Sequence, residues 1–259
     1  MDDVHDGGLQ ADLAVLWARF GRRRVLKGMA MFSAACATPG LGGLTGDTGG
    51  GGACARIPEE TEGPYPGDGT NGPDALALDG IVRSDLTGSI GSGVGTAAGV
   101  PLTLRLRIVD ASGCTPLAGA AVYVWHCDQD GNYSMYTAAA ATYLRGVQVT
   151  DADGYVEFTT IFPGCYSGRW PHVHFEVYPD LDAIDDARNK IATSQVALPE
   201  ATCDEVYATS GYEASVANLA RTSLSSDMVF SDSWPAELAG IAGTVTDGLV
   251  ASLSVPVSA

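Results

Sequence analysis

Short runs of alternating apolar and polar residues, separated by turn sequences, restrict the fold of this chain more than any other feature. Residues Leu102 to Val109 read Leu-Thr-Leu-Arg-Leu-Arg-Ile-Val, the period of a strand with one buried face. Further strands are predicted at Ala120 to Cys127, Tyr155 to Ile161, Pro171 to Tyr178, Ala192 to Leu198 and Leu249 to Val257, and one amphipathic helix at Glu213 to Arg221. Turn sequences rich in Asp and Gly lie between the strands. This spacing predicts a mainly β protein, a β-sandwich with large loops and one or two short helices.

The length and charge of the chain limit its domain count and its partners. With 259 residues, 46% of them hydrophobic, it can form one sizeable domain with a real core. The formal net charge is -17, and such a field repels phosphate backbones and anionic lipid surfaces. We therefore expect no nucleic-acid partner and attribute the acidity to solubility.

The N-terminal region has the features of an export signal. The stretch Gly21-Arg22-Arg23-Arg24-Val25-Leu26-Lys27 precedes an uncharged run and resembles a twin-arginine motif. The run is short and broken by Gly and Pro, so no stable membrane span is predicted. We assign residues 1–38 to the signal, 39–53 to a Gly-rich flexible linker and 54–259 to the folded domain, and expect an exported protein. The alternative is a basic amphipathic helix that belongs to the fold.

The cysteines favour neither a zinc site nor one particular disulfide pattern. They stand at positions 36, 54, 114, 127, 165 and 203, without any Cys-x-x-Cys pair. If Cys36 leaves with a signal, five remain and at least one is unpaired. The sequence leaves the pairing open.

The pair His172-Val173-His174 is the first candidate for chemistry. Residues i and i+2 of a strand project from the same face about 6.5–7 Å apart, so both imidazoles can bind one metal ion. Such a pair is also found in cross-strand packing or on a polar face. The neighbourhood strengthens the metal reading, because Tyr166 follows a Pro-Gly turn and Arg169 precedes the pair. A second tyrosine, Tyr133, lies in a polar turn after another predicted strand, although either tyrosine alone could be an amphipathic core residue.

These segments together resemble the intradiol ring-cleavage dioxygenases, especially the exported catechol dioxygenase-like branch and the protocatechuate 3,4-dioxygenases. The resemblance covers about residues 54 to 255 in order. It is carried by Thr61 to Tyr65, Cys114 to Ala120, Trp125 to Asp128, Gly131 to Ser134, Leu144 to Asp151, Thr160 to Gly164 and Tyr166 to His174.

The resemblance implies a role for each residue of a metal site. It assigns Tyr133, Tyr166, His172 and His174 as iron ligands, with Tyr166 as the ligand that leaves when substrate binds. It also assigns Arg169 as the active-site arginine, and the catalytic set is Tyr166, Arg169 and Gln195. Cys165 departs from the pattern, because a bulky aromatic residue is usual there, and the departure bears on the pocket and the substrate.

Such a ligand set suits Fe(III) as the cofactor. Phenolate oxygens are hard anions that hold iron in its ferric state, and two of them with a hydroxide cancel the trication, so the site can be buried. The implied enzyme is a dioxygenase that takes a small aromatic diol and O₂ and gives a cis,cis-muconate-type diacid. Arg169 would stabilise developing negative charge.

Two other functions and several residues remain open at this point. The chain could be a non-catalytic metal-binding β-sandwich module, or an Fe(II) or copper oxygenase that uses His172 and His174 with an acidic ligand. His126 is interpreted as a structural hydrogen-bonding group, and Glu62 and Tyr65 as part of a loop near the pocket. The particular catechol and the oligomeric state cannot be read from the sequence.

Overall fold

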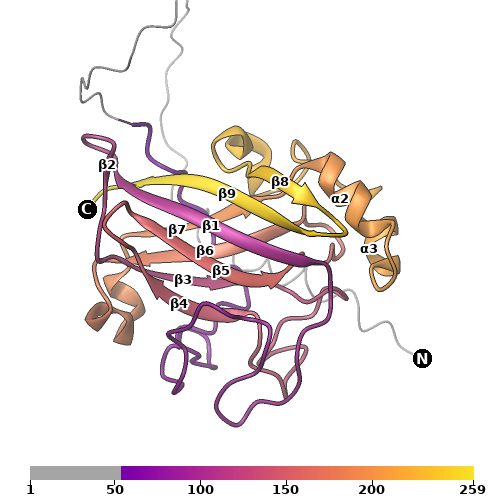
Figure 1. Cartoon of the computed structure of the whole chain (residues 1–259), viewed down its shortest axis with the longest axis horizontal. Coiled ribbons are helices and arrows are strands. Elements are labelled where there is room, and N and C mark those ends of the chain that lie inside the picture. The colour runs from indigo at the N-terminus through magenta and orange to yellow at the C-terminus, as the bar shows by residue number, and fades with distance from the viewer. Residues whose placement is uncertain (1–53) are drawn as a thin grey trace, which may run out of the picture.

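Two packed β-sheets form the body of the molecule (Figure 1). The computed structural model describes residues 54–259, so the predicted signal and linker, and Cys36, lie outside the described residues. The first sheet has the order β2-β1-β9-β8, with β5 also paired to β1, and the second has the order β4-β3-β6-β7. The strands are β1 Pro101–Asp110, β2 Thr115–Pro116, β3 Ala121–Trp125, β4 Arg145–Val149, β5 Tyr155–Ile161, β6 His172–Tyr178, β7 Ala192–Ala197, β8 Gly240–Thr244 and β9 Gly248–Val257. The predicted β-sandwich is confirmed.

The first sheet follows the alternation seen in the sequence. In β1 the side chains of Leu102, Leu104, Leu106 and Ile108 are at most 1% exposed and face the core, while the intervening residues are partly or fully exposed. The C-terminal strand β9 runs parallel to β1, whereas the other strand pairs of both sheets are antiparallel. This sheet therefore has one buried face, as a period of two requires.

The second sheet is buried on both faces. In β3, Val122 and Val124 pack into the core between the sheets, while Tyr123 and Trp125 pack on the opposite face. That opposite face is covered by apolar residues from the loops before β1 and between β3 and β4. The second sheet therefore offers an enclosed surface outside the sandwich core, and the candidate site lies on it.

Two short α-helices follow β7 and lie at one end of the sandwich (Figure 1). Helix α3 (Glu213–Leu219) coincides with the predicted helix, and α2 (Glu200–Tyr207) buries Cys203, Val206 and Tyr207 along one face. The 3₁₀ turns are η2 Asp182–Asp185, η3 Ala187–Asn189, η4 Phe230–Asp232 and η5 Trp234–Ala236. Within residues 54–259, none of the helices has the length and apolar character that a membrane crossing requires.

One disulfide bond joins Cys54 to the turn that follows β1, at Cys114. Its sequence separation is 60 residues, for which loop-closure entropy corresponds to about 4 kcal/mol of stabilisation. Cys127, Cys165 and Cys203 are buried free thiols. The bond attaches the start of the described chain to the first sheet.

Candidate metal centre

Strand β6 places His172 and His174 together on the outer face of the second sheet. The intervening Val173, and Phe175 after the pair, belong to the core between the sheets. Both imidazoles are 2% exposed, and their Nε2 atoms are 3.0 Å apart. The alternation of the strand thus produces the convergence predicted from the His-x-His spacing.

Two loops bring Tyr133 and Tyr166 to the same point. Tyr133 follows a turn in which the Asp128 carboxylate accepts the Asn132 N–H at 2.8 Å. Tyr166 follows the Pro-Gly turn, and the N–H of Gly164 donates to the carbonyl of Asp128 at 3.0 Å. The loop that carries one tyrosine is therefore hydrogen-bonded to the loop that carries the other.

Four polar atoms converge at this point. The Tyr133 and Tyr166 hydroxyls are 3.4 Å apart, and each lies 3.3 Å from Nε2 of His172. First-row metal ions bind imidazole nitrogen at roughly 2.0–2.1 Å, and ligand atoms around one such ion lie roughly 3.0–3.4 Å from their neighbours. The observed spacing fits one shared ion. The four side chains assigned as ligands from the sequence are therefore brought together.

His172 carries its proton on the side away from this point. A carbonyl oxygen can only accept, so Nδ1–H of His172 donates to the carbonyl of Trp170 at 2.5 Å, and Nε2 keeps its lone pair. Burial, with the nearby charge of Arg169, lowers the pKa of His172 to about 3. Burial also holds the pKa of His174 well below its ordinary value. Both rings are neutral near pH 7, as metal binding requires.

Aromatic rings enclose the four atoms. The His174 ring stacks on the indole of Trp125, with centroids 4.8 Å apart and an interplanar angle of 6°. Nδ1 of His174 is buried and has no hydrogen-bond partner among the described residues, so this stacking fixes the ring plane. The ring of Tyr65 lies 5.0 Å from that of Tyr133. Tyr65 is thus in contact with the site, whereas the sequence had placed it only in a nearby loop.

Arg169 and Gln195 are joined next to the histidine pair. The Arg169 guanidinium donates to Oε1 of Gln195 at 2.6 Å, and Nε2 of Gln195 donates to the carbonyl of Thr61 at 2.9 Å. Nε of Arg169 lies 3.0 Å from a carboxylate oxygen of Asp227, in an ion pair whose two side chains are fully buried. The same oxygen accepts the Trp170 N–H at 2.6 Å. Asp227 therefore orients the arginine and the segment leading into β6.

Sequence reasoning did not identify Asp227. Its other carboxylate oxygen accepts the N–H groups of Val229 and Phe230, so its local pattern is that of an ordinary turn aspartate. Its partner Arg169 is 58 residues earlier in the chain. A buried arginine needs a carboxylate partner, so the sequence could have suggested that such a residue exists. That expectation does not show which acidic residue it is.

Two further residues have the roles of core groups. Nδ1–H of His126 donates to the carbonyl of Cys127 and Nε2 accepts from the hydroxyl of Thr160, both at 2.7 Å, which confirms its structural interpretation. Burial lowers the pKa of His126 to about 4. The thiol of Cys165 lies in the core between the sheets, and burial raises its pKa to about 12. The residue that departs from the family pattern thus packs in the core rather than beside the ring of Tyr166.

The donor set distinguishes between kinds of metal. Two phenol oxygens with two neutral imidazoles suit a hard, highly charged ion such as Fe(III). An Fe(II) or copper site of the alternative kind needs a carboxylate beside the histidines. In the described part of the chain, the one group of three or more His, Cys, Asp or Glu side chains with ligand atoms close enough to share an ion is Glu62, Asp68 and Glu176, which contains neither histidine.

Comparison with known proteins finds relatives in both sequence and structure. The family profile described as Dioxygenase matches residues 76–180, a segment that includes all four converging side chains. The structure is similar to that of an intradiol ring-cleavage dioxygenase from Tetranychus urticae, with a TM-score of 0.61 and 27% identity over 79% of this chain and 94% of that one. In this segment and in its fold, the chain is similar to the intradiol ring-cleavage dioxygenases.

Curated members of the intradiol family match over shorter segments. A chlorocatechol 1,2-dioxygenase from Rhodococcus opacus is 32% identical over 32% of this chain and 45% of its own length. Catechol 1,2-dioxygenase 1 from Acinetobacter lwoffii is 32% identical over 41% of this chain and 38% of its own length. The match therefore spans less than half of either relative.

Proposed function

We propose that this chain is a non-haem Fe(III) dioxygenase that cleaves catechol-type rings between their two hydroxylated carbons. It uses O₂ and gives cis,cis-muconate-type diacids. The convergence of two phenol oxygens and two imidazole nitrogens carries the proposal, because their separations of 3.0–3.4 Å fit a single ion. The relatives named for catechol and chlorocatechol support the substrate class.

Tyr133, Tyr166, His172 and His174 would hold the iron. Ferric iron held there would supply a Lewis acid that draws electron density from a bound catechol, so that the ring could react with O₂. The two histidines remain neutral donors. The two tyrosines provide the anionic oxygens that balance the charge of the metal.

The two tyrosines differ in how firmly they are held. Tyr133 is 1% exposed and packs against Tyr65, whereas Tyr166 is partly exposed. We therefore assign Tyr166 as the side chain that moves aside when a catechol enters. Its phenolate oxygen accepts one proton from the incoming diol, while Tyr133 keeps its position.

Arg169 acts on the charge that develops on the ring. Its guanidinium is buried, and Asp227 and Gln195 fix its direction before substrate arrives. A fixed donor in a dry environment stabilises negative charge without reorganisation during the reaction. Because Asp227 balances its formal charge, Arg169 contributes oriented N–H groups more than net charge.

The experiment is a visible spectrum of the iron-replete protein, followed by O₂ uptake and product analysis with a panel of catechols. Wild-type protein should show a strong tyrosinate-to-iron band and consume O₂. Tyr133→Phe and Tyr166→Phe should each weaken or shift the band, and Tyr155→Phe, on the other sheet, should leave it unchanged. A colourless iron protein that is inert toward every catechol would overturn the proposal and favour the Fe(II), copper or binding-module alternatives.

We also propose that the protein is exported through the twin-arginine route. The motif at Arg22 and Arg23 supports this, and so does the Cys54–Cys114 disulfide, since such bonds persist in oxidising compartments. That route carries folded proteins, so iron could be inserted before transit. Replacing both arginines by lysine should abolish secretion, and secretion that continues would contradict the route.

A further inference from the structure

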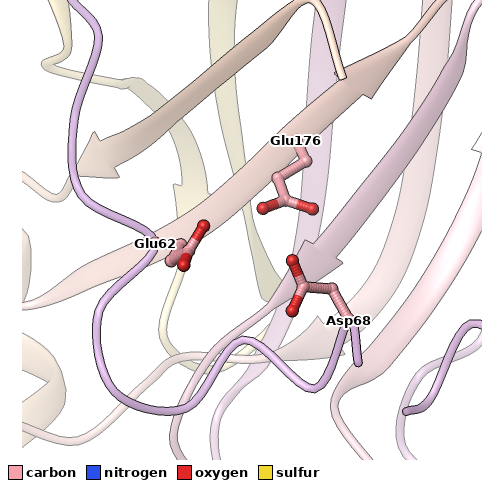
Figure 2. A group of neighbouring side chains, drawn as sticks. All are labelled: Glu62, Asp68 and Glu176. Carbon is pink, nitrogen blue, oxygen red and sulfur yellow. The ribbon is translucent and has the colours of Figure 1, made fainter. Parts of the chain in front are cut away.

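The face of β6 that carries the two histidines continues into a second group of charged side chains. Glu176 is the next residue on that face after His174, and the Tyr178 hydroxyl donates to it at 2.9 Å. Figure 2 shows the carboxylates of Glu62 and Asp68, on the loop before β1, facing the carboxylate of Glu176 on β6. Their nearest ligand atoms all lie within 4.8 Å of each other.

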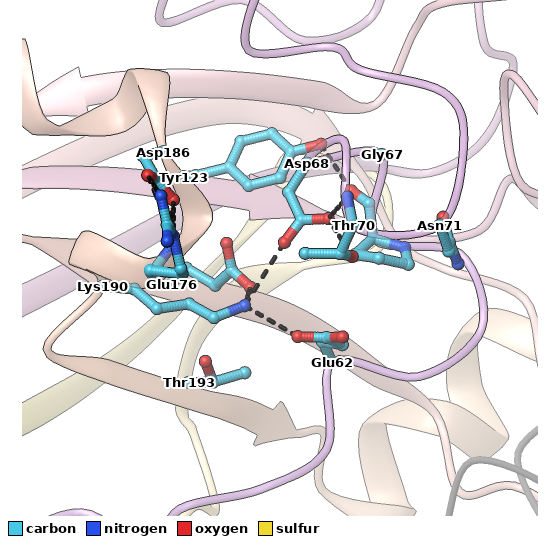
Figure 3. A network of polar contacts seen from close by, with 12 residues as sticks. Glu62, Gly67, Asp68, Thr70, Asn71, Tyr123, Glu176, Asp186, Lys190 and Thr193 are labelled. Carbon is cyan, nitrogen blue, oxygen red and sulfur yellow. Dashed lines mark hydrogen bonds and ion pairs between the residues drawn. The ribbon is translucent and has the colours of Figure 1, made fainter.

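Lys190 provides the cation for this group (Figure 3). Its ammonium lies 2.6 Å from Glu176, 2.7 Å from Glu62 and 3.3 Å from Asp68. Three N–H donors on one nitrogen match three carboxylate acceptors. Although burial alone lowers the pKa of Lys190, the Glu176 and Glu62 carboxylates raise it above its ordinary value, so the ammonium stays charged. We therefore interpret the group as an ion network centred on lysine and not as a divalent-cation site.

The network holds both ends of the segment that contacts the metal centre. Glu62 and Asp68 bracket Gly63 to Gly67, and the middle of this segment is Tyr65, whose ring packs on Tyr133. Two prolines, at positions 64 and 66, restrict the backbone between the two ends. A displacement of either anchored end is therefore transmitted to Tyr65.

A second cation holds the middle of the same segment. Arg145 donates to the carbonyl of Tyr65 at 2.9 Å and to that of Pro66 at 2.7 Å. It also donates to the carbonyl of Ser134, directly after Tyr133. The Tyr123 hydroxyl also donates to the Pro66 carbonyl, at 2.8 Å, so Arg145 and Tyr123 together hold the middle of the segment. Lys190 ties its two ends to Glu176 and so connects the loop to the strand that carries the histidines.

Because the network is buried, its carboxylates depend on Lys190 for charge compensation. Asp68 and Glu176 side chains are fully buried, and Lys190 and Glu62 are only 17% and 16% exposed. Removing one partner of a buried pair leaves a charge without compensation, which costs more than the pair itself contributes. Loss of Lys190 would leave carboxylates that repel one another and push Glu62 and Asp68 away from β6.

We propose that Lys190 is a positioning residue that fixes residues 62–68 on β6 and so sets where Tyr65 rests against Tyr133. Its effect on catalysis rests on the proposed function, but its effect on the loop does not. The lysine acts at a distance from the reacting atoms, through the loop and the Tyr65 ring.

The test compares Lys190→Met with Lys190→Arg, and uses Arg188→Met as the matched control. Arg188 lies in the same segment but pairs with Asp186 at the surface. Amide hydrogen exchange of metal-free protein should be on the order of tenfold faster across residues 62–68 in Lys190→Met, with β3 and β6 unchanged. Lys190→Arg should restore most of the protection, and Arg188→Met should resemble wild type.

A second set of measurements uses iron-replete protein. The tyrosinate band should shift in Lys190→Met, and KM for catechol should rise more than kcat falls, because the loop is misplaced while the iron ligands remain. If Lys190→Met does not fold, Glu62→Ala decides, since it removes one anchor while Glu176 and Asp68 still pair with the lysine, and it should loosen residues 62–68 alone. Unchanged exchange in these residues would overturn the proposal. A wild-type protein without band or O₂ uptake would overturn the proposed function instead and leave the exchange result standing.

Discussion

Arg169 carries a fully buried positive charge, and Asp227 is the carboxylate that balances it. We expect Asp227→Asn to lower the free energy of unfolding by about 3–5 kcal/mol, because the guanidinium keeps its charge and loses its counter-ion. The single oxygen of the amide can keep the bond from Trp170 or the bonds from Val229 and Phe230, but not both, so the loss also includes backbone hydrogen bonds. Denaturant unfolding of the two proteins measures the difference.

The matched control for Asp227→Asn is Asp186→Asn. Asp186 also pairs with an arginine, but the Arg188 side chain is 89% exposed, and water screens such a pair. The same substitution there should leave the unfolding free energy nearly unchanged. Equal losses of unfolding free energy at the two positions would show that burial does not explain the contribution of the Arg169–Asp227 pair to stability.

At this scale the sequence identifies residues whose partners are close by in the chain. His172 and His174 are two residues apart on one strand, and Tyr166 and Arg169 lie in the segment just before them. Tyr133 required the family resemblance, since its loop meets the Tyr166 loop only in the folded structure. Asp227 was not predicted, because its pairing with Arg169 depends wholly on tertiary structure.

The Pro-Gly turn before Tyr166 is the element on which the metal centre depends most directly. A methyl group on Gly164 would meet the carbonyl oxygens of Gln129 at 2.5 Å and Asp128 at 2.9 Å. These are backbone atoms of the loop that leads to Tyr133, so they cannot rotate away. We expect Gly164→Ala to cost about 1–3 kcal/mol of stability and to weaken the tyrosinate band, measured by unfolding and by the visible spectrum.

Gly113→Ala is the control for this turn. The nearest atom to a methyl group at Gly113 is Cγ2 of Thr115, at 3.7 Å, which is ordinary contact. Stability should change by no more than about 0.5 kcal/mol, and the band should be the same as in wild type. A Gly164→Ala protein as stable and as coloured as Gly113→Ala would contradict the close packing of the two tyrosine loops.

Among the elements, the longer strands were predicted, including the fully buried β3, β6 and β7, whereas β2, β4, β8 and helix α2 were not. The alternation in β1, β5 and β9 is visible because one face of their sheet is exposed. Strand β4 reads Arg-Gly-Val-Gln-Val and buries its arginine, so its beginning has the composition of a loop. Helix α2 is short and buries only three residues, which gives weak periodicity.

At the scale of the whole molecule, a pair of carboxyl groups joins the segment at Glu60, near the start of the described chain, to the segment before β8 at Glu237. The Ser233 hydroxyl lies 2.8 Å from Glu237 and 3.2 Å from Glu60. A hydroxyl has one proton to donate, so the second carboxyl can bond to the serine oxygen only by carrying its own proton. Burial, reinforced by Glu237 and Asp232, raises the pKa of Glu60 to about 8 despite Arg169. Burial also raises the pKa of Glu237 to about 7, with Asp232 and Asp227 adding to the effect.

Raised carboxyl pKa values make the protein less stable as the pH rises. Below about pH 4.5 both groups hold their protons in the folded and unfolded chains, so their contribution is fully present. Between pH 4.5 and about 8 the unfolded chain releases protons that the folded chain retains, and each step upward in pH favours unfolding. The two groups therefore oppose folding at alkaline pH.

Replacing one of the two carboxyls by an amide isolates this effect. The side chain at position 237 of the Glu237→Gln variant cannot ionise. The fall in unfolding free energy from pH 5 to pH 8 should therefore be smaller in the variant than in wild type, by on the order of 2 kcal/mol. Unfolding free energies of both proteins at the two pH values give the difference, with Glu205→Gln on the exposed side of α2 as a control that should follow wild type. Parallel pH dependences for wild type and Glu237→Gln would mean that Glu237 is already ionised in the folded protein. In that case the single hydroxyl proton of Ser233 could bond to only one of the two carboxylates at a time. The segments at Glu60 and Glu237 would then be held together by the backbone hydrogen bonds from Glu60 to β7 and from β7 to Glu237.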